Sequence, residues 1–232
     1  MNTVTMGLIW YVVFLFSTVF HEAAHSWAAY KMGDPTAYEG GQVSLNPAPH
    51  IKRSPFGLVF VPLFTFYASG WMMGWASAPY DPHWALQYPR RAGWMSLAGP
   101  AANLILVVAA GLMIHAGLWL GVFREPDVIH FSTVVESVNG GLYSSAATLL
   151  SIVFSLNLLL CLFNLLPFPP LDGSGAMTLL LTEKVSEKYL SFIRTPQLQF
   201  ISFYAAWKIF DVIFDPVHLI AINLLYPGAG YH

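Results

Sequence analysis

The sequence predicts an all-α integral membrane protein, with about four transmembrane helices and a re-entrant or membrane-associated hairpin region between the first two of them. Of its 232 residues, 56% are hydrophobic and only 9% are charged, whereas soluble domains carry roughly 25% charged residues. The apolar residues gather in runs long enough to cross a bilayer, and one further run is broken by proline and glycine. We therefore expect a multi-pass protein of the cell membrane, embedded as a single domain over residues 1–232.

Four stretches reach the roughly 20 predominantly apolar residues that a transmembrane helix needs. They are residues 6–30, 93–116, 145–166 and 198–225. The first resembles a signal peptide in its apolar character, but it lacks a basic leading region and carries polar residues within the run. We interpret it as a retained transmembrane helix.

A fifth apolar stretch, residues 57–76, either crosses the membrane or dips in and returns, because Pro62, Gly70 and Gly74 interrupt it. Lys and Arg concentrate in cytoplasmic loops, and a return places nearly all of them on one face, leaving Arg124 in the opposite loop. These basic residues are Lys31, Lys52, Arg53, Arg90, Arg91, Lys184, Lys188 and Arg194.

The order of the helices also favours a return at residues 57–76. With a return, stretches 6–30 and 145–166 run parallel, so polar residues near their ends meet at a similar depth. We therefore expect a re-entrant or membrane-associated hairpin there, with the site nearer the cytoplasmic face. In the preceding Gly- and Pro-rich segment, the β-like piece Gln42–Leu45 indicates a small hairpin or a loop at the membrane surface.

The net charge argues against one class of partner, and the single cysteine excludes a disulfide within the chain. A net charge of -2 supplies no basic field that would attract nucleic acid. Cys161 is the single cysteine, so no disulfide forms within the chain. The oligomeric state stays open, because apolar surface that faces lipid resembles apolar surface that faces another subunit.

The motif His21-Glu22-Ala23-Ala24-His25 lies late in the first apolar stretch. Its two histidines are four residues apart on one helical face, which suits two ligands of a single Zn²⁺ ion, and Glu22 beside them suits a base that takes a proton from water. Ionisable residues inside a membrane cost roughly 2.5 to 3.5 kcal/mol each and mark functional sites by default. We therefore expect one catalytic zinc ion per chain.

A catalytic zinc normally has three protein ligands and an open position, and Asp172 is the leading candidate for the third. It stands in Asn-Leu-Leu-Pro-Phe-Pro-Pro-Leu-Asp-Gly, residues 164–173, where prolines end a helix beside the carboxylate. The alternative is that Asp172 caps the N-terminus of a following helix, residues 173–181, a role compatible with metal binding.

The two motifs together resemble those of the site-2 protease family of intramembrane zinc metalloproteases. The resemblance includes Ala98-Gly99-Pro100 at the start of the second long helix, extends over about residues 6–180, and is nearest to small members built almost only from the membrane core. It leaves the last helix, 198–225, outside. It implies that Asp172 is the third metal ligand and Glu22 the catalytic base.

By the same resemblance, Asn164 holds the substrate backbone or stabilises the oxyanion. Its alternative role is a hydrogen bond between helices. Asn46-Pro47 to His50 is similar to a motif of the small members. His50 is a fourth ligand, an occluding residue in an uncleaved resting state, or merely a polar loop residue.

The function expected from these residues is zinc-dependent hydrolysis of peptide bonds in transmembrane or membrane-anchored proteins, within the bilayer. The partners would be a membrane-spanning protein or peptide and the lipid itself. The alternative is a non-proteolytic membrane protein that binds or transports metal. Glu22 argues against simple binding, and a transporter would carry polar residues along a path through the bilayer, whereas here they gather at one depth.

Overall fold

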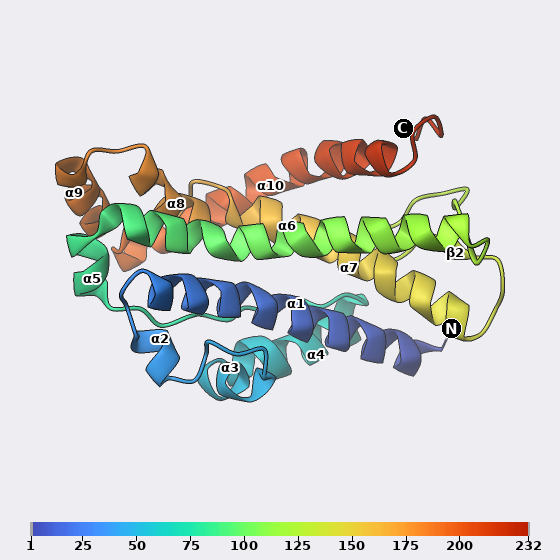
Figure 1. Ribbon diagram of the computed structural model, residues 1–232, viewed down its shortest axis with the longest axis horizontal. Coiled ribbons are helices and arrows are strands. Elements are labelled where there is room, and N and C mark those ends of the chain that lie inside the picture. Colours follow the sequence, from blue (N-terminus) through green and yellow to red (C-terminus); the bar gives the residue numbers. More distant parts are fainter. Residues whose placement is uncertain (1, 232) are drawn as a thin grey trace.

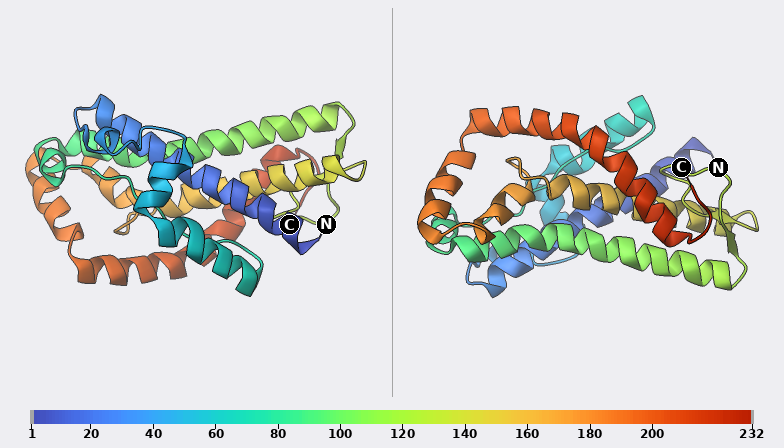
Figure 2. Two further views of the ribbon diagram at one scale, coloured as in Figure 1. Left: turned by 90° about the horizontal axis from the view of Figure 1, so that it is seen from below. Right: turned by 90° about the horizontal axis from the view of Figure 1, so that it is seen from above.

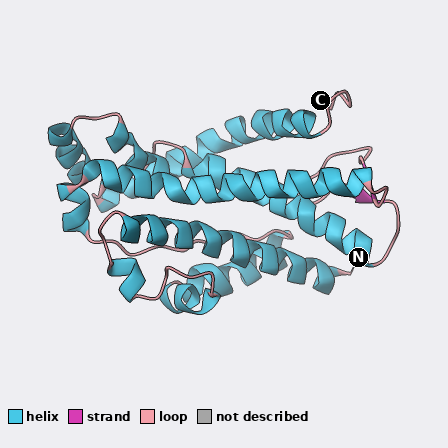
Figure 3. Ribbon diagram, in the orientation of Figure 1, coloured by secondary structure: helices cyan, strands magenta, loops and turns pink. Residues whose placement is uncertain are grey.

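The computed structural model describes residues 2–231 and consists mainly of helices (Figures 1 and 3). Its elements, in chain order, are α1 (Thr3–Lys31), α2 (Thr36–Glu39), α3 (Pro47–Arg53), η1 (Phe56–Phe60), α4 (Val61–Ser69), α5 (Pro82–Gln87), α6 (Pro89–Trp119), β1 (Phe123–Arg124), β2 (Glu136–Ser137), α7 (Leu142–Asn164), α8 (Asp172–Ala176), η2 (Met177–Leu179), α9 (Glu183–Ile193) and α10 (Pro196–Leu225).

Three long helices form the centre of the molecule. Helices α1 and α7 run in the same direction and α6 runs opposite to both (Figure 1). Among residues 2–231, these are the three helices whose length and apolar character suit a membrane crossing. The parallel course of α1 and α7, expected from the sequence, brings the end of α1 and the end of α7 to the same region.

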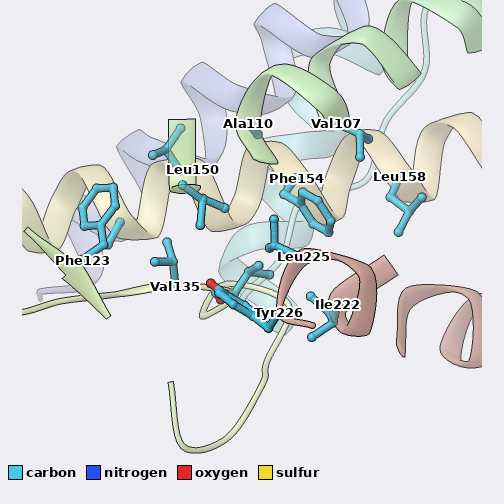
Figure 4. Close-up of a cluster of buried hydrophobic side chains, with 13 residues drawn as sticks. Val107, Ala110, Phe123, Val135, Leu150, Phe154, Leu158, Ile222, Leu225 and Tyr226 are labelled. Atoms are coloured by element: carbon cyan, nitrogen blue, oxygen red, sulfur yellow. The ribbon is translucent and has the colours of Figure 1, made fainter. Parts of the chain in front are cut away.

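Helix α10 corresponds to the expected fourth apolar stretch, but its middle carries Lys208, Asp211 and Asp215. Its last turns pack against α6 and α7, where Ile222 and Leu225 join a buried apolar cluster (Figure 4). The helix bends in its middle (Figure 2), and Pro216 lies within it, where it removes a backbone hydrogen bond. The axis of the first half of α10 therefore points in a different direction from that of the second half, which packs against α6 and α7.

Residues 57–76 do not form one helix. The helical part, η1 and α4, ends at Ser69, and Gly70 follows with a φ of 80°, a left-handed conformation that glycine adopts without strain. The chain then returns in extended form: Met73 N donates to Thr65 Oγ1 at 3.0 Å and Trp75 N donates to Gly57 O at 3.1 Å. The outgoing helix and the returning segment thus lie side by side.

The β-like piece Gln42–Leu45 is not a strand but a series of bends. Gly41, with a φ of 74°, turns the chain just before it. Asn46 then caps α3 by accepting a hydrogen bond from Ala48 N at 3.0 Å, so the segment lacks the length to pair with a neighbour. The described strands are instead the two-residue pair β1–β2 in the loop between α6 and α7.

The two ends of the bundle differ in their content of Lys and Arg. The C-terminal end of α1, the N-terminal end of α6, and helices α5 and α9 gather at one end (Figure 1), and this end carries Lys31, Arg90, Arg91, Lys184 and Lys188. The strand pair β1–β2 and both chain termini lie at the other end. The excess of basic residues is therefore on the side where α1 and α7 finish.

Candidate metal centre

Helix α1 presents His21, Glu22 and His25 toward the interior, where each side chain is buried. The two histidines lie one helical turn apart, and their Nε2 atoms are 3.0 Å from each other. The helical spacing expected from the motif thus brings two potential metal ligands together.

Asp172 completes this group from a different part of the chain. After α7 ends at Asn164, a proline-rich turn leads to α8, whose first residue is Asp172. Its Oδ2 lies 3.0 Å from His21 Nε2 and its Oδ1 lies 3.2 Å from His25 Nε2. Leu171 occupies the N-cap position of α8, and no side-chain hydrogen bond caps this helix. The carboxylate of Asp172 faces the two histidines instead.

The hydrogen bonds on the far side of the two imidazole rings determine which nitrogen is free. His25 Nδ1 lies 2.7 Å from the carbonyl oxygen of Met95, which only accepts, so Nδ1 carries the proton. His21 Nδ1 lies 2.5 Å from Asn103 Oδ1. In the neutral form of each ring, Nε2 is therefore the nitrogen that carries the lone pair, as metal-binding histidines require.

This arrangement fits a divalent cation. Two imidazole lone pairs and one carboxylate converge, with the ligand atoms all within 4.8 Å of one another. Asp172 Oδ2 is buried and has no hydrogen-bond donor. Electron pairs that face one another without a proton are stabilised by a cation, and two nitrogens with one oxygen form a donor set that suits zinc.

Gly99 on α6 leaves the space that such an ion needs. A Cβ atom at this position would overlap His25 Nε2 and would lie 2.5 Å from His21 Nε2. The backbone of α6 thus approaches the imidazole nitrogens as closely as a residue without a side chain allows.

A cavity of about 1390 Å³ opens beside the group and is lined by Glu22 and Asn164 as well as by His21, His25 and Asp172. Its walls include the returning segment around Trp75 and the first half of α10. The cavity is large enough to admit a stretch of extended polypeptide next to the candidate metal ligands.

Glu22 is positioned beside the ligands and not among them. It follows His21 directly, is buried, and lines the cavity. Its place on the cavity wall puts an ionisable side chain next to the three candidate ligands.

Asn164 lines the same cavity, and its Nδ2 donates to Leu160 O within α7 at 3.0 Å. This hydrogen bond stays within α7 and does not join two helices. One amide hydrogen and the amide oxygen remain for other contacts.

His50 lies apart from the metal ligands. It is buried in α3, its Nε2 contacts Ser44 O at 3.0 Å, and it is absent from the metal-ligand group formed by the described residues. The structure does not bring His50 to the site as a fourth ligand.

The sequence reasoning missed Asn103, Asn157 and Ser17. All three are buried and they connect to His21 through side-chain hydrogen bonds. The only available signal was the presence of asparagines inside apolar helices, where an amide needs a partner.

Helix α9 holds the turn after Asp172 in place. Tyr189 donates its hydroxyl hydrogen to Ser174 O at 2.9 Å. Burial raises the pKa of the Tyr189 phenol, because the charged phenolate is disfavoured away from water. The hydroxyl therefore stays protonated and remains a donor.

The fold and the site define a class of protein: a helical membrane protein whose first long helix bears a His-Glu-x-x-His pair, completed by a distant aspartate. The sequence profile of peptidase family M50 matches residues 9–205, which is most of the chain. The chain therefore belongs to this family, the site-2 protease family of zinc metallopeptidases.

Named relatives agree with this membership. The chain is 34% identical over 163 residues to the Bacillus subtilis protein named "Putative zinc metalloprotease YwhC", covering 70% of this chain and 64% of the relative. It is 28% identical over 163 residues to a protein of the same description named Rip2 from Mycolicibacterium smegmatis, covering 70% of this chain and 53% of the relative. It is 29% identical over 170 residues to Rip2 of Mycobacterium tuberculosis, with the same coverage.

The matched region thus spans between about half and two thirds of the length of these relatives. No solved structure matches the chain significantly. The roles proposed for the site residues are therefore argued from the geometry of this chain and not from a solved relative.

Proposed function

We propose that this chain is a zinc-dependent endopeptidase that hydrolyses peptide bonds of transmembrane or membrane-anchored proteins within the bilayer, near the cytoplasmic face. The observation that carries the proposal is the convergence of His21, His25 and Asp172 beside Glu22 at the wall of a large cavity. A membrane protein that only binds metal needs the three ligands but has no use for a buried glutamate next to them.

In this proposal, His21, His25 and Asp172 hold one zinc ion. When bound, zinc supplies a Lewis acid that activates water and polarises the scissile carbonyl. Glu22 accepts the proton of the attacking water and delivers it to the leaving amine. Asn164 lies on the same cavity wall, where its amide can hold the substrate backbone or donate to the developing oxyanion.

The chain would form a single membrane-embedded protease domain with its catalytic core at about residues 6–180. Helices α1, α6 and α7 would cross the membrane, with α10 as a fourth span whose two aspartates, Asp211 and Asp215, line the cavity. The helix η1–α4 and the returning segment would form a re-entrant region, which is permitted where its backbone lies against protein.

The basic end of the bundle supports a site near the cytoplasm of a cell membrane. The metal-ligand group lies toward the finishing ends of α1 and α7, which is the end rich in Lys and Arg, and such residues favour the cytoplasmic side.

A transmembrane substrate must unwind before it can be cut, because an intact helix engages its carbonyls in backbone hydrogen bonds. The cavity offers space for an unwound stretch, and its wall includes extended chain between Trp71 and Ala78. Helix-breaking residues near the cleaved bond are therefore an expected preference.

The test compares wild type with Glu22→Gln on a transmembrane reporter substrate in proteoliposomes, with zinc measured in the same preparations. We expect the variant to retain about one zinc per chain and to lose cleavage. Cleavage that survives in the variant contradicts the role of Glu22. Wild type that binds zinc, fails to cleave any of a panel of transmembrane reporters and moves zinc across the membrane supports the transport alternative instead.

A further inference from the structure

A chain of buried amides connects His21 to the two neighbouring long helices. His21 on α1 contacts Asn103 on α6, Asn103 contacts Asn157 on α7, and Asn157 returns to Ser17 on α1. Asn103 and Asn157 are fully buried and Ser17 is 1% exposed. Such groups are costly in an apolar interior unless every partner is satisfied, so their presence calls for a role.

The direction of each hydrogen bond follows from one main-chain carbonyl. Asn157 Nδ2 lies 2.8 Å from Val153 O, and a carbonyl oxygen only accepts, so this atom of Asn157 is the nitrogen. The same Nδ2 donates to Ser17 Oγ at 2.9 Å. Asn157 Oδ1 must then be the atom that faces Asn103.

The orientation of Asn103 is determined in turn. Asn157 Oδ1 accepts from Asn103 Nδ2 at 2.8 Å, which leaves Asn103 Oδ1 pointing at His21. A side-chain carbonyl oxygen has no proton to give, so His21 Nδ1 must donate across the 2.5 Å contact. The tautomer of His21 is thus set by a relay that begins at the backbone of α7.

We propose that Asn103 is the positioning residue of the metal centre, and that Asn157 acts through it. Asn103 keeps the proton of His21 on Nδ1 and fixes the ring so that the Nε2 lone pair points at the metal. The proposal rests on the proposed zinc site. Without Asn103, the ring of His21 is free to rotate or to place its proton on Nε2, and either change removes a ligand.

The two histidines are held by different means, which makes the inference testable. His25 donates to a backbone carbonyl, Met95 O, which no side-chain substitution removes. His21 depends on a side chain. Substitution of Asn103 therefore impairs one ligand selectively.

The test measures the zinc dissociation constant of the purified full-length protein by competition with a chelator, without reference to activity. Replacing the hydrogen-bond acceptor behind a metal-binding histidine typically weakens metal affinity by about 10- to 100-fold. We expect a loss of this size in Asn103→Leu. Asn103→Asp keeps an acceptor for His21 but loses the donor to Asn157, and we expect its zinc affinity to stay within about threefold of wild type.

Asn103→Asp separates positioning from simple packing. Both Asn103 variants break the contact with Asn157, and the aspartate adds a buried charge, so a merely structural residue would suffer at least as much from Asp as from Leu. Equal losses in the two variants, or wild-type affinity in Asn103→Leu, would overturn the proposal.

Two further variants guard against failure to fold. Asn157→Leu leaves Asn103 Oδ1 available to His21 but removes the partner that orients the Asn103 amide. We expect a smaller loss of zinc affinity than in Asn103→Leu. Ser151→Ala is the matched control: Ser151 is also buried on α7 and accepts from Val134 N at 2.9 Å, but it has no link to His21. Its zinc affinity should equal that of wild type.

Two variants distinguish an error in the metal site from an error in the role of Asn103. If His21→Ala binds zinc as tightly as wild type, the metal site itself is wrong and the positioning role falls with it. If zinc binding depends on His21 but is unchanged in Asn103→Leu, the site stands and only the role of Asn103 is refuted.

Discussion

Gly99→Ala is the sharpest perturbation of the candidate metal centre, because it adds one methyl group where the structure leaves no room. The new Cβ would lie 2.5 Å from His21 Nε2, whereas Cβ atoms essentially never lie closer than 3.0 Å to such a neighbour. The ring must therefore retreat by about 0.5 Å, the difference between these distances, and His25 Nε2 must move as well.

Zinc sites tolerate deviations of about 0.2 Å in the distance from metal to ligand. Displacing two of three ligands by more than this exceeds the loss of a supporting hydrogen bond, which costs about 10- to 100-fold in affinity. We therefore expect the zinc affinity of Gly99→Ala to fall by at least about a hundredfold, or about 2.8 kcal/mol at 1.4 kcal/mol per tenfold change.

The assay is chelator competition on purified protein, with elemental analysis of zinc and a thermal melt of the apo form. Gly111→Ala is the matched control on the same helix, because its Cβ would lie at an ordinary 3.5 Å from Leu225 Cδ1. Both substitutions favour the helix by up to about 1 kcal/mol, so a loss of zinc in Gly99→Ala alone is a steric effect. Wild-type zinc affinity in Gly99→Ala would refute the placement of the ion between α1 and α6.

Two other substitutions test neighbouring parts of the site. Asp172→Ala should reduce zinc affinity by more than about a hundredfold, since it removes one of three ligands, and elemental analysis that finds a full complement of zinc in this variant would require a different third ligand. Asn164→Leu should keep zinc and the thermal midpoint near wild type but lower kcat by about 100-fold, as expected for a lost oxyanion donor; a lower midpoint with unchanged kcat would instead indicate a purely structural asparagine.

The long helices were predictable from the sequence because their cause is local. Crossing a bilayer takes about 20 apolar residues, and stretches 6–30, 93–116 and 145–166 became α1, α6 and α7 with ends shifted by only a few residues. One shift has a local cause: Asn2 accepts from Thr5 N at 2.8 Å and so starts α1 earlier than its apolar run. The fourth span and the re-entrant region remain predictions.

Short segments were harder to predict, because contacts distant in sequence decide them. Gln42–Leu45 has β-forming composition but finds no strand to pair with. In residues 57–76, Gly70 was visible in the sequence as an interruption, and the helix does stop at Ser69, where Gly70 turns the chain. The partners of the returning segment, Thr65 and Gly57, were not predictable. An apolar pattern alone does not distinguish these outcomes.

The sequence by itself indicated a membrane protein and brought together two of the three candidate metal ligands. Composition predicted a membrane protein, and the spacing of His21 and His25 on one helix brings these two candidate ligands together whatever surrounds them. Only the tertiary structure decided the rest: that Asp172 meets the histidines and does not cap α8, that Gly99 makes room between them, and that Asn103 and Asn157 support His21. Each of these residues lies on a different element from α1, and no period in the sequence records which faces of packed helices will touch.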